Sequence, residues 1–214
     1  MNKKTIVPIL AVLAICGSLA LIYFDRPSRG PKMKLKPYEA VGEVAAQEIA
    51  KLLGHKGEVL VIAEDFGKYN MRWADVELAS FKKSLKQQGS IHLQGVEKVV
   101  DPMISEAAGS RFSAEDFSRM LKSHPKIDGI VLFANFPPTA DQELSLLRDS
   151  GTKVVAVSTY GPGLKRLLET KVVQVAIVPR TDPLAATSQP RSLREWFDQT
   201  YELITPDNVP TLTY

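Results

Sequence analysis

The chain has 214 residues, enough for one domain of ordinary size with additional segments. Its 27 basic and 24 acidic residues leave a net charge of +3, which is too small and too dispersed to indicate a nucleic-acid-binding surface. The proportions of apolar and charged residues are those of a folded globular chain and exclude an intrinsically disordered one.

The first segment predicts a connection to a membrane. After a short tail, residues 1–5, the run IVPILAVLAICGSLALIYF at residues 6–24 has no charged side chain and is about as long as a membrane-spanning helix. Three interpretations remain open. We favour an uncleaved transmembrane signal anchor, because the run exceeds the usual core of a signal peptide. The others are cleavage after Ala20 and a lipoprotein modified at Cys16, which is the only cysteine in the chain.

A basic, proline-containing stretch follows the apolar run. Residues 25–36, DRPSRGPKMKLK, are typical of a semi-extended linker that holds a domain away from the bilayer. A contact between its lysines and lipid headgroups is the alternative.

Apolar runs of strand length then alternate with segments of helical periodicity. The first helix is predicted to end at Gly54, and the capping pairs Ser113/Asp116 and Thr139/Gln142 each predict the start of a later helix. Strands are predicted at residues 58–63, 90–100, 130–133, 153–158 and 172–178. A last amphipathic helix is predicted over residues 192–204.

This alternation predicts right-handed crossovers and a sheet covered on both faces. We expect a three-layer α/β/α sandwich around a mostly parallel five-stranded sheet in the flavodoxin-like order 2-1-3-4-5. The domain is expected to span residues 37–204, with residues 205–214 as a C-terminal tail.

The sequence contains few residues that indicate catalysis. The three histidines are not spaced as metal ligands, no nucleophile motif is present, and the one cysteine lies in the apolar run. The sequence GPGLKR at residues 161–166 follows a strand and opens a helix, but it lacks the third glycine of a dinucleotide-binding motif. We therefore expect no enzyme activity, no metal site and no cofactor.

The candidate ligand-binding residues follow the predicted strands, because parallel strands present ligands at their carboxyl ends. These residues are Asp65, Arg72, Asn135, Phe136, Tyr160 and Arg180. Structural alternatives exist for several of them; Arg180, for example, could pair with Asp182 in a turn.

The order of these segments resembles the C-terminal lobe of the sugar-type, ribose-binding-like (type I) periplasmic binding proteins, over roughly residues 38–183. The resemblance is carried by VGEVAAQEIAKLLGHKGEVLVI, ELASFKKSLKQQGSIHL, FSRMLKSHPKIDGIVLFAN and GTKVVAVSTYGPGLKRLLETKVVQVAIVPRTDP. It implies that Asn135 faces a ligand. The family's arginine on the second of these segments is replaced here by Glu77 or a neighbour, and its Asn-Asp pair becomes Asn135-Phe136.

The resemblance implies a membrane-anchored, non-catalytic module that binds or senses a small, sugar-like solute. A partner lobe or a homodimer would complete the site, because residues 1–37 leave no room for an N-terminal lobe. The alternative is a degenerate lobe that acts as a structural or protein-interaction domain at the membrane surface. Lysine and arginine counts around the apolar run favour a cytoplasmic domain. The resemblance instead implies a single-pass inner-membrane protein with its domain in the periplasm, and we adopt that expectation.

Overall fold

The computed structural model describes residues 34–67, 69, 71–100, 112–136, 141–157, 162–181 and 189–209. A compact unit begins at Leu35. No helix in these ranges is both long and apolar enough to cross a bilayer. The predicted anchor at residues 6–24 and most of the linker lie outside the described residues.

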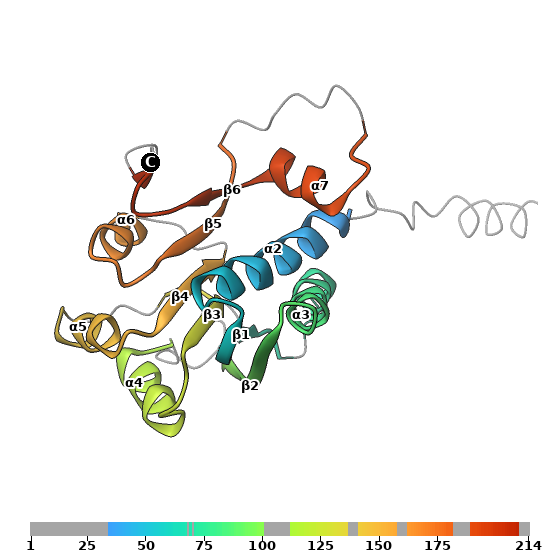
Figure 1. The fold of residues 1–214 in the computed structure, drawn as a ribbon. Helices are drawn as coiled ribbons and strands as arrows, with labels where there is room; N and C mark the ends of the chain where they lie inside the picture. The colour runs from blue at the N-terminus through green and yellow to red at the C-terminus, as the bar shows by residue number, and fades with distance from the viewer. Residues whose placement is uncertain are drawn as a thin grey trace, which may run out of the picture. The chain divides into compact units, whose positions relative to one another are not determined.

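Helices and strands alternate along the unit, as the sequence predicts (Figure 1). In chain order they are α2 (Lys36–Leu52), β1 (Lys56–Asp65), α3 (Arg72–Leu85), β2 (Ser90–Val100), α4 (Ala114–Ser123), β3 (Gly129–Phe133), α5 (Asp141–Ser150), β4 (Lys153–Val157), α6 (Pro162–Glu169), β5 (Val175–Pro179), α7 (Leu193–Thr200) and β6 (Tyr201–Ile204).

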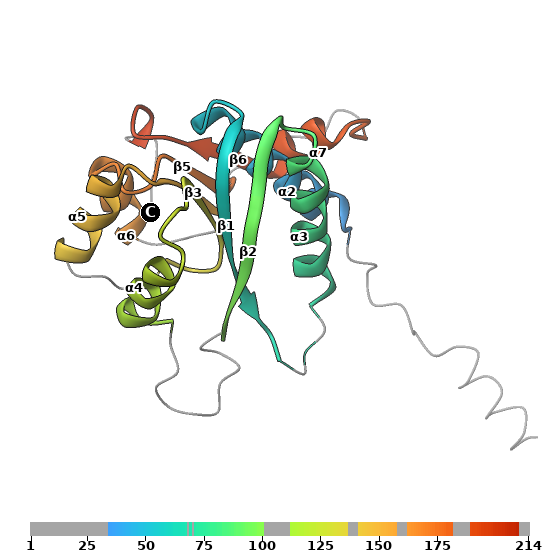
Figure 2. The same ribbon diagram turned by 60° about the horizontal axis from the view of Figure 1, so that its bottom comes forward.

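The strands form a sheet in the order β2-β1-β3-β4-β5-β6 within the described residues. The first five strands are parallel, in the order that the sequence predicts. Figure 2 shows the two longest strands, β1 and β2, between two groups of helices. β2 is at the sheet edge, as expected from its more polar sequence.

Each face of the sheet carries its own hydrophobic core. Val59 and Val61 of β1 pack on one face with α2, α3 and α7, whereas Leu60 and Ile62 pack on the other with α4, α5 and α6. All four side chains are fully buried. Burial on both faces explains why the strands are continuous apolar runs rather than alternating ones.

The chain's own signals set several helix boundaries. At the start of α4, the Ser113 hydroxyl accepts a hydrogen bond from the Asp116 backbone N–H at 3.1 Å, and the Asp116 carboxylate accepts one from the Ser113 backbone N–H at 3.2 Å. The predicted capping box is therefore present. After α2, Gly54 adopts a φ of 61°, which a glycine accommodates at little cost.

The prediction of a single last helix over residues 192–204 is wrong. α7 ends at Thr200, Tyr201 is extended, and residues 201–204 form β6, antiparallel to β5. The apolar spacing of Leu193, Trp196, Tyr201 and Ile204 fits a helix, but β5 offers an unpaired edge that a helix cannot satisfy. Tyr201 and Ile204 are buried as predicted, although they are in a strand.

Candidate functional site

Three of the predicted site residues follow parallel strands at one edge of the sheet, which we call the carboxyl edge. Asp65 ends β1, Asn135 follows β3 by two residues, and Arg180 directly follows β5. β1 and β3 are neighbours, and β4 separates β3 from β5. With about 4.8 Å between adjacent strands, the ends of β3 and β5 lie roughly 10 Å apart, the scale of a small ligand. Tyr160, which follows β4, lies outside the described residues.

Two of these residues lie where β1 leads into α3. Asp65 is exposed, and its Oδ1 accepts a hydrogen bond from the Gly67 backbone N–H at 2.9 Å. This bond shapes a tight turn, and no hydrogen bond to the second carboxylate oxygen is present among the described residues. Arg72 is exposed at the first position of α3, at the same edge.

Asn135 and Phe136 differ in their surroundings although they are adjacent. Asn135 is exposed, and no hydrogen bond engages its amide in the described part of the chain. Phe136 is half-buried, and its ring lies 5.5 Å from that of Phe117 of α4, centroid to centroid. Phe136 therefore anchors the tip of β3 to α4, and Asn135 is the polar group presented at this tip.

Arg180 ties β5 to the C-terminal elements. Its Nε donates a hydrogen bond to the backbone carbonyl of Asp198 at 2.8 Å, and its Nη1 lies 3.6 Å from Oε2 of Glu202. Its side chain is 28% exposed. A ligand at this edge would therefore meet a guanidinium that already has two partners. Asp182, the alternative partner expected from the sequence, lies outside the described residues.

An aromatic group that the sequence analysis missed borders the same edge. The Trp73 ring of α3 lies 5.6 Å from that of Tyr38 and 5.4 Å from that of Phe66, centroid to centroid. Phe66 directly follows β1, and Tyr38 is in the first turn of α2. The chain therefore enters the domain beside the carboxyl edge. Tyr38 is far from Phe66 and Trp73 in the sequence, so only the fold brings it to them.

Glu77, one helical turn after Trp73, is buried. The residue is only 4% exposed, and no hydrogen bond or ion pair engages its carboxyl among the described residues. Burial, and to a smaller extent the nearby charge of Glu64, raise the pKa of Glu77 to about 8. The apolar face of α3 contains Trp73, Glu77 and Phe81 at intervals of four residues. A glutamate on that face is the feature of the sequence that could have predicted this buried carboxyl.

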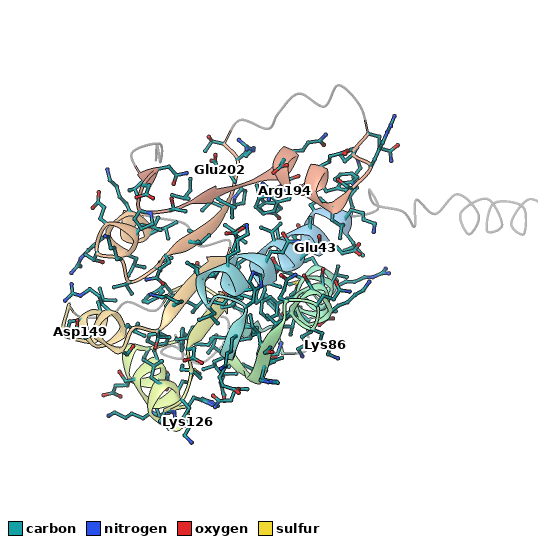
Figure 3. All side chains as sticks on the ribbon, viewed as in Figure 1. Glu43, Lys86, Lys126, Asp149, Arg194 and Glu202 are labelled. Atoms are coloured by element: carbon teal, nitrogen blue, oxygen red, sulfur yellow. The ribbon has the colours of Figure 1, made fainter. Side chains whose placement is uncertain are left out.

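Several cavities lie away from the carboxyl ends of the central strands. One of about 430 Å³ lies between the end of β2 and α4, lined by Val99, Phe112 and Met120 among others. Others, of about 540 and 440 Å³, lie at the opposite, amino-terminal edge of the sheet and share Thr152 and Lys153. Figure 3 shows that charged side chains such as Lys126 and Asp149 lie on the outside of the domain.

No protein-family model and no curated protein sequence matches the chain. Solved structures do match. An ABC-transporter solute-binding protein from Burkholderia graminis C4D1M, in complex with D-arabinose, aligns with a TM-score of 0.59 and 17% identity over 82% of this chain and 62% of its own. AraP, an arabinose-binding protein from Geobacillus stearothermophilus, aligns with a TM-score of 0.55 and 15% identity over 83% of this chain and 63% of its own. A structure of the XylFII–LytSN complex aligns with a TM-score of 0.53 and 14% identity over 80% of this chain and 60% of its own.

These likenesses establish the fold. The chain has the α/β architecture of the sugar-type solute-binding proteins, as the resemblance in its sequence implied. It spans less than two thirds of the length of the solute-binding proteins that it matches.

Proposed function

We propose that this protein is a membrane-tethered, non-catalytic module that holds a small, sugar-like solute at the carboxyl edge of its sheet. The observation that carries the proposal is the exposed amide of Asn135, which lies at the end of β3 in a binding-protein fold and which no hydrogen bond engages in the described part of the chain. Asp65 and Arg72 lie at the same edge and supply an acceptor and a donor for hydroxyl groups.

The proposal includes an anchor and an incomplete site. The apolar run at residues 6–24 supports the anchor, with the domain on the periplasmic side of the inner membrane. A single lobe covers a small ligand on one side only, so its affinity from desolvation is low. A partner lobe or a second copy of the chain would supply the opposite wall.

Thermal unfolding of the full chain in detergent micelles, followed by tryptophan fluorescence, tests this proposal. The ligands are D-arabinose, D-glucose and D-sorbitol, each at up to tens of millimolar. A ligand at about 100 times its Kd stabilises the folded state by about 2.7 kcal/mol, which raises the melting temperature by roughly 5–10 °C.

Asn135→Ala is expected to abolish the shift, because it removes the amide without altering a buried contact. Gln87→Ala is the matched control, since Gln87 is an exposed amide that lies after α3, away from the carboxyl edge. A shift that survives Asn135→Ala, or the lack of a shift with every solute, would contradict the proposed site.

A specific observation favours the second candidate, an interaction domain. Phe136, at the ligand-facing tip, packs into the core against Phe117, and β2 has no strand partner on its outer side in the described sheet. One of the solved structures with this fold is a complex of two proteins. If this candidate is correct, sedimentation in detergent shows a concentration-dependent dimer that the solutes do not change.

A further inference from the structure

Two adjoining cavities at the amino-terminal edge of the sheet have no part in the proposed function. Their volumes are about 540 and 440 Å³, within the range of small-molecule pockets. Both are lined by the last residue of α2, Leu52, and by the segment that leads from α5 into β4, Gly151, Thr152 and Lys153. Because they share these residues, the two cavities form one concave surface at the edge opposite Asn135.

Lysines without a counter-ion line this surface. Lys153 is half-buried and borders both cavities, whereas Lys56 borders the smaller one and Lys171 the larger. No hydrogen bond or ion pair engages any of these three ammonium groups among the residues that the structure describes. An ammonium group only donates hydrogen bonds, so each of the three needs an acceptor from water or from a ligand.

The acidic side chains of the lining are fewer, and two of the three have partners. Glu48 Oε1 lies 2.5 Å from the ammonium nitrogen of Lys51, and Asp128 Oδ2 accepts a hydrogen bond from the Glu58 backbone N–H at 2.8 Å. Asp207 is the third acid and is exposed. Positive charge therefore exceeds negative charge on this surface.

Helix dipoles account for only two of the four cations in the lining. Arg148 is in the last turn of α5, with its Nε 3.4 Å from Oδ1 of Asp149, and Lys171 follows α6. A cation is favourable at both of these places, because the carboxyl end of a helix is partially negative. Lys56 and Lys153 instead begin β1 and β4, so neither belongs to the last turn of a helix.

Lys171 also occupies a backbone position that favours glycine. The second residue after α2 is Gly54 with a φ of 61°, and the second residue after α6 is Lys171 with a φ of 58°. This conformation strains a lysine but not a glycine. The backbone N–H groups of Lys171 and Val172 already donate to the carbonyls of Leu168 and Leu167, each at 2.9 Å. The Lys171 ammonium is therefore not needed to cap α6.

We propose that these cavities form a binding site for the phosphate group of a small organic molecule. A phosphate monoester has between one and two negative charges at pH 7 and three strong acceptor oxygens, and lysine binds phosphate as a point charge on a flexible stem. Three ammonium groups match this charge better than that of a single carboxylate. Leu52 and Val175 offer apolar contacts to the organic part. The site lies at the other end of the strands from the proposed solute site and does not depend on it.

Calorimetry on the full chain, in a non-ionic detergent and a phosphate-free buffer, compares glycerol 2-phosphate with glycerol and with glycerate. We expect glycerol 2-phosphate to bind, glycerol not to bind, and glycerate to bind at least about tenfold more weakly than the phosphate. The affinity for glycerol 2-phosphate is expected to fall several-fold between about 50 and 500 mM NaCl, because salt screens the charges. No binding of glycerol 2-phosphate up to tens of millimolar, or equal binding of glycerate, would overturn the inference.

Two variants test the cavity itself. Lys153→Gln and Lys171→Gly each remove one ammonium group, and the second also relieves the positive φ, so its fold is expected to persist. Each variant is expected to weaken the binding of glycerol 2-phosphate about tenfold or more. Lys86→Gln is the matched control, since Lys86 follows α3 at the same edge, lines neither cavity and lies on the outside of the domain (Figure 3). An equal effect of all three substitutions would indicate a diffuse attraction to the edge and overturn the site.

Hydrogen–deuterium exchange with glycerol 2-phosphate locates the site. We expect slower exchange in peptides that cover residues 51–57, 148–153 and 169–175, and no change in peptides that cover residues 133–136. Asn135→Ala is expected to leave this binding unchanged. Protection confined to the carboxyl edge would overturn the phosphate site, whereas a lack of sugar binding contradicts only the proposed function.

Discussion

At the scale of single residues, the buried carboxyl of Glu77 makes the stability of the domain depend on pH. The folded state raises the pKa of this group from 4.5 to about 8, so the folded protein holds a proton that the unfolded chain has lost. Below pH 4.5 the Glu77 carboxyl is protonated in both the folded and the unfolded state and does not destabilise the fold. Between pH 4.5 and 8 the free energy of unfolding falls as the pH rises, and above pH 8 this group lowers it no further.

We predict that Glu77→Gln stabilises the protein at pH 8, by an amount on the order of 4 kcal/mol, and leaves its stability at pH 4.5 nearly unchanged. Urea denaturation at several pH values between 4.5 and 8.5 measures the difference. Equal pH dependence in the variant and the parent would contradict the burial of this carboxyl, and Glu115→Gln, at an exposed glutamate of α4, serves as the control.

At the scale of elements, the crossing of α2 over α3 depends on Gly42. A methyl group at Gly42 would overlap the backbone carbonyl of Glu77 and lie 2.8 Å from the backbone nitrogen of Phe81. Because backbone atoms cannot yield as the end of a side chain can, α2 and α3 would have to separate.

We predict that Gly42→Ala destabilises the fold by about 1–3 kcal/mol, even though alanine is the better helix former. Gly163→Ala in α6 is the matched control. Its added methyl meets no atom within 4 Å, so we expect a gain of up to about 1 kcal/mol. Chemical denaturation of both variants measures the difference, and a stable Gly42→Ala would contradict the close crossing.

The elements also show how far the sequence determines the structure. The parallel strands and the α4 capping box were predictable, because each depends on a local signal: strand-length apolar runs for β1 to β5, and Ser113 with Asp116 for the cap. β6 was not predictable, because Tyr201 and Ile204 fit a helical spacing and only the open edge of β5 makes them a strand. Likewise, Asn135 could be placed at a strand end, but the contact of Tyr38 with Trp73 depends on how α2 packs.

At the scale of the whole molecule, the chain enters the domain beside the candidate site, since Tyr38 in the first turn of α2 contacts Trp73. On our proposal the domain is periplasmic. Lys126 is exposed and, as Figure 3 shows, lies on the outside of the domain.

We predict that Lys126→Cys becomes labelled by a membrane-impermeant maleimide in intact bacteria that express the chain. The parent chain is the control, because its only cysteine, Cys16, lies in the apolar run. Labelling of the variant only after lysis would place the domain in the cytoplasm, as the count of basic residues suggests, and would overturn the proposed localisation.

The central claim is that a small solute binds at the carboxyl edge, and hydrogen–deuterium exchange of the full chain with and without solute tests it most directly. Our account predicts slower exchange in peptides that cover residues 64–67, 133–136 and 178–181. It predicts no change in peptides that cover residues 51–57 and 148–153, at the opposite edge of the sheet. Unchanged exchange at the carboxyl edge with every sugar and polyol tested, or protection confined to another surface such as the edge strand β2, would contradict it.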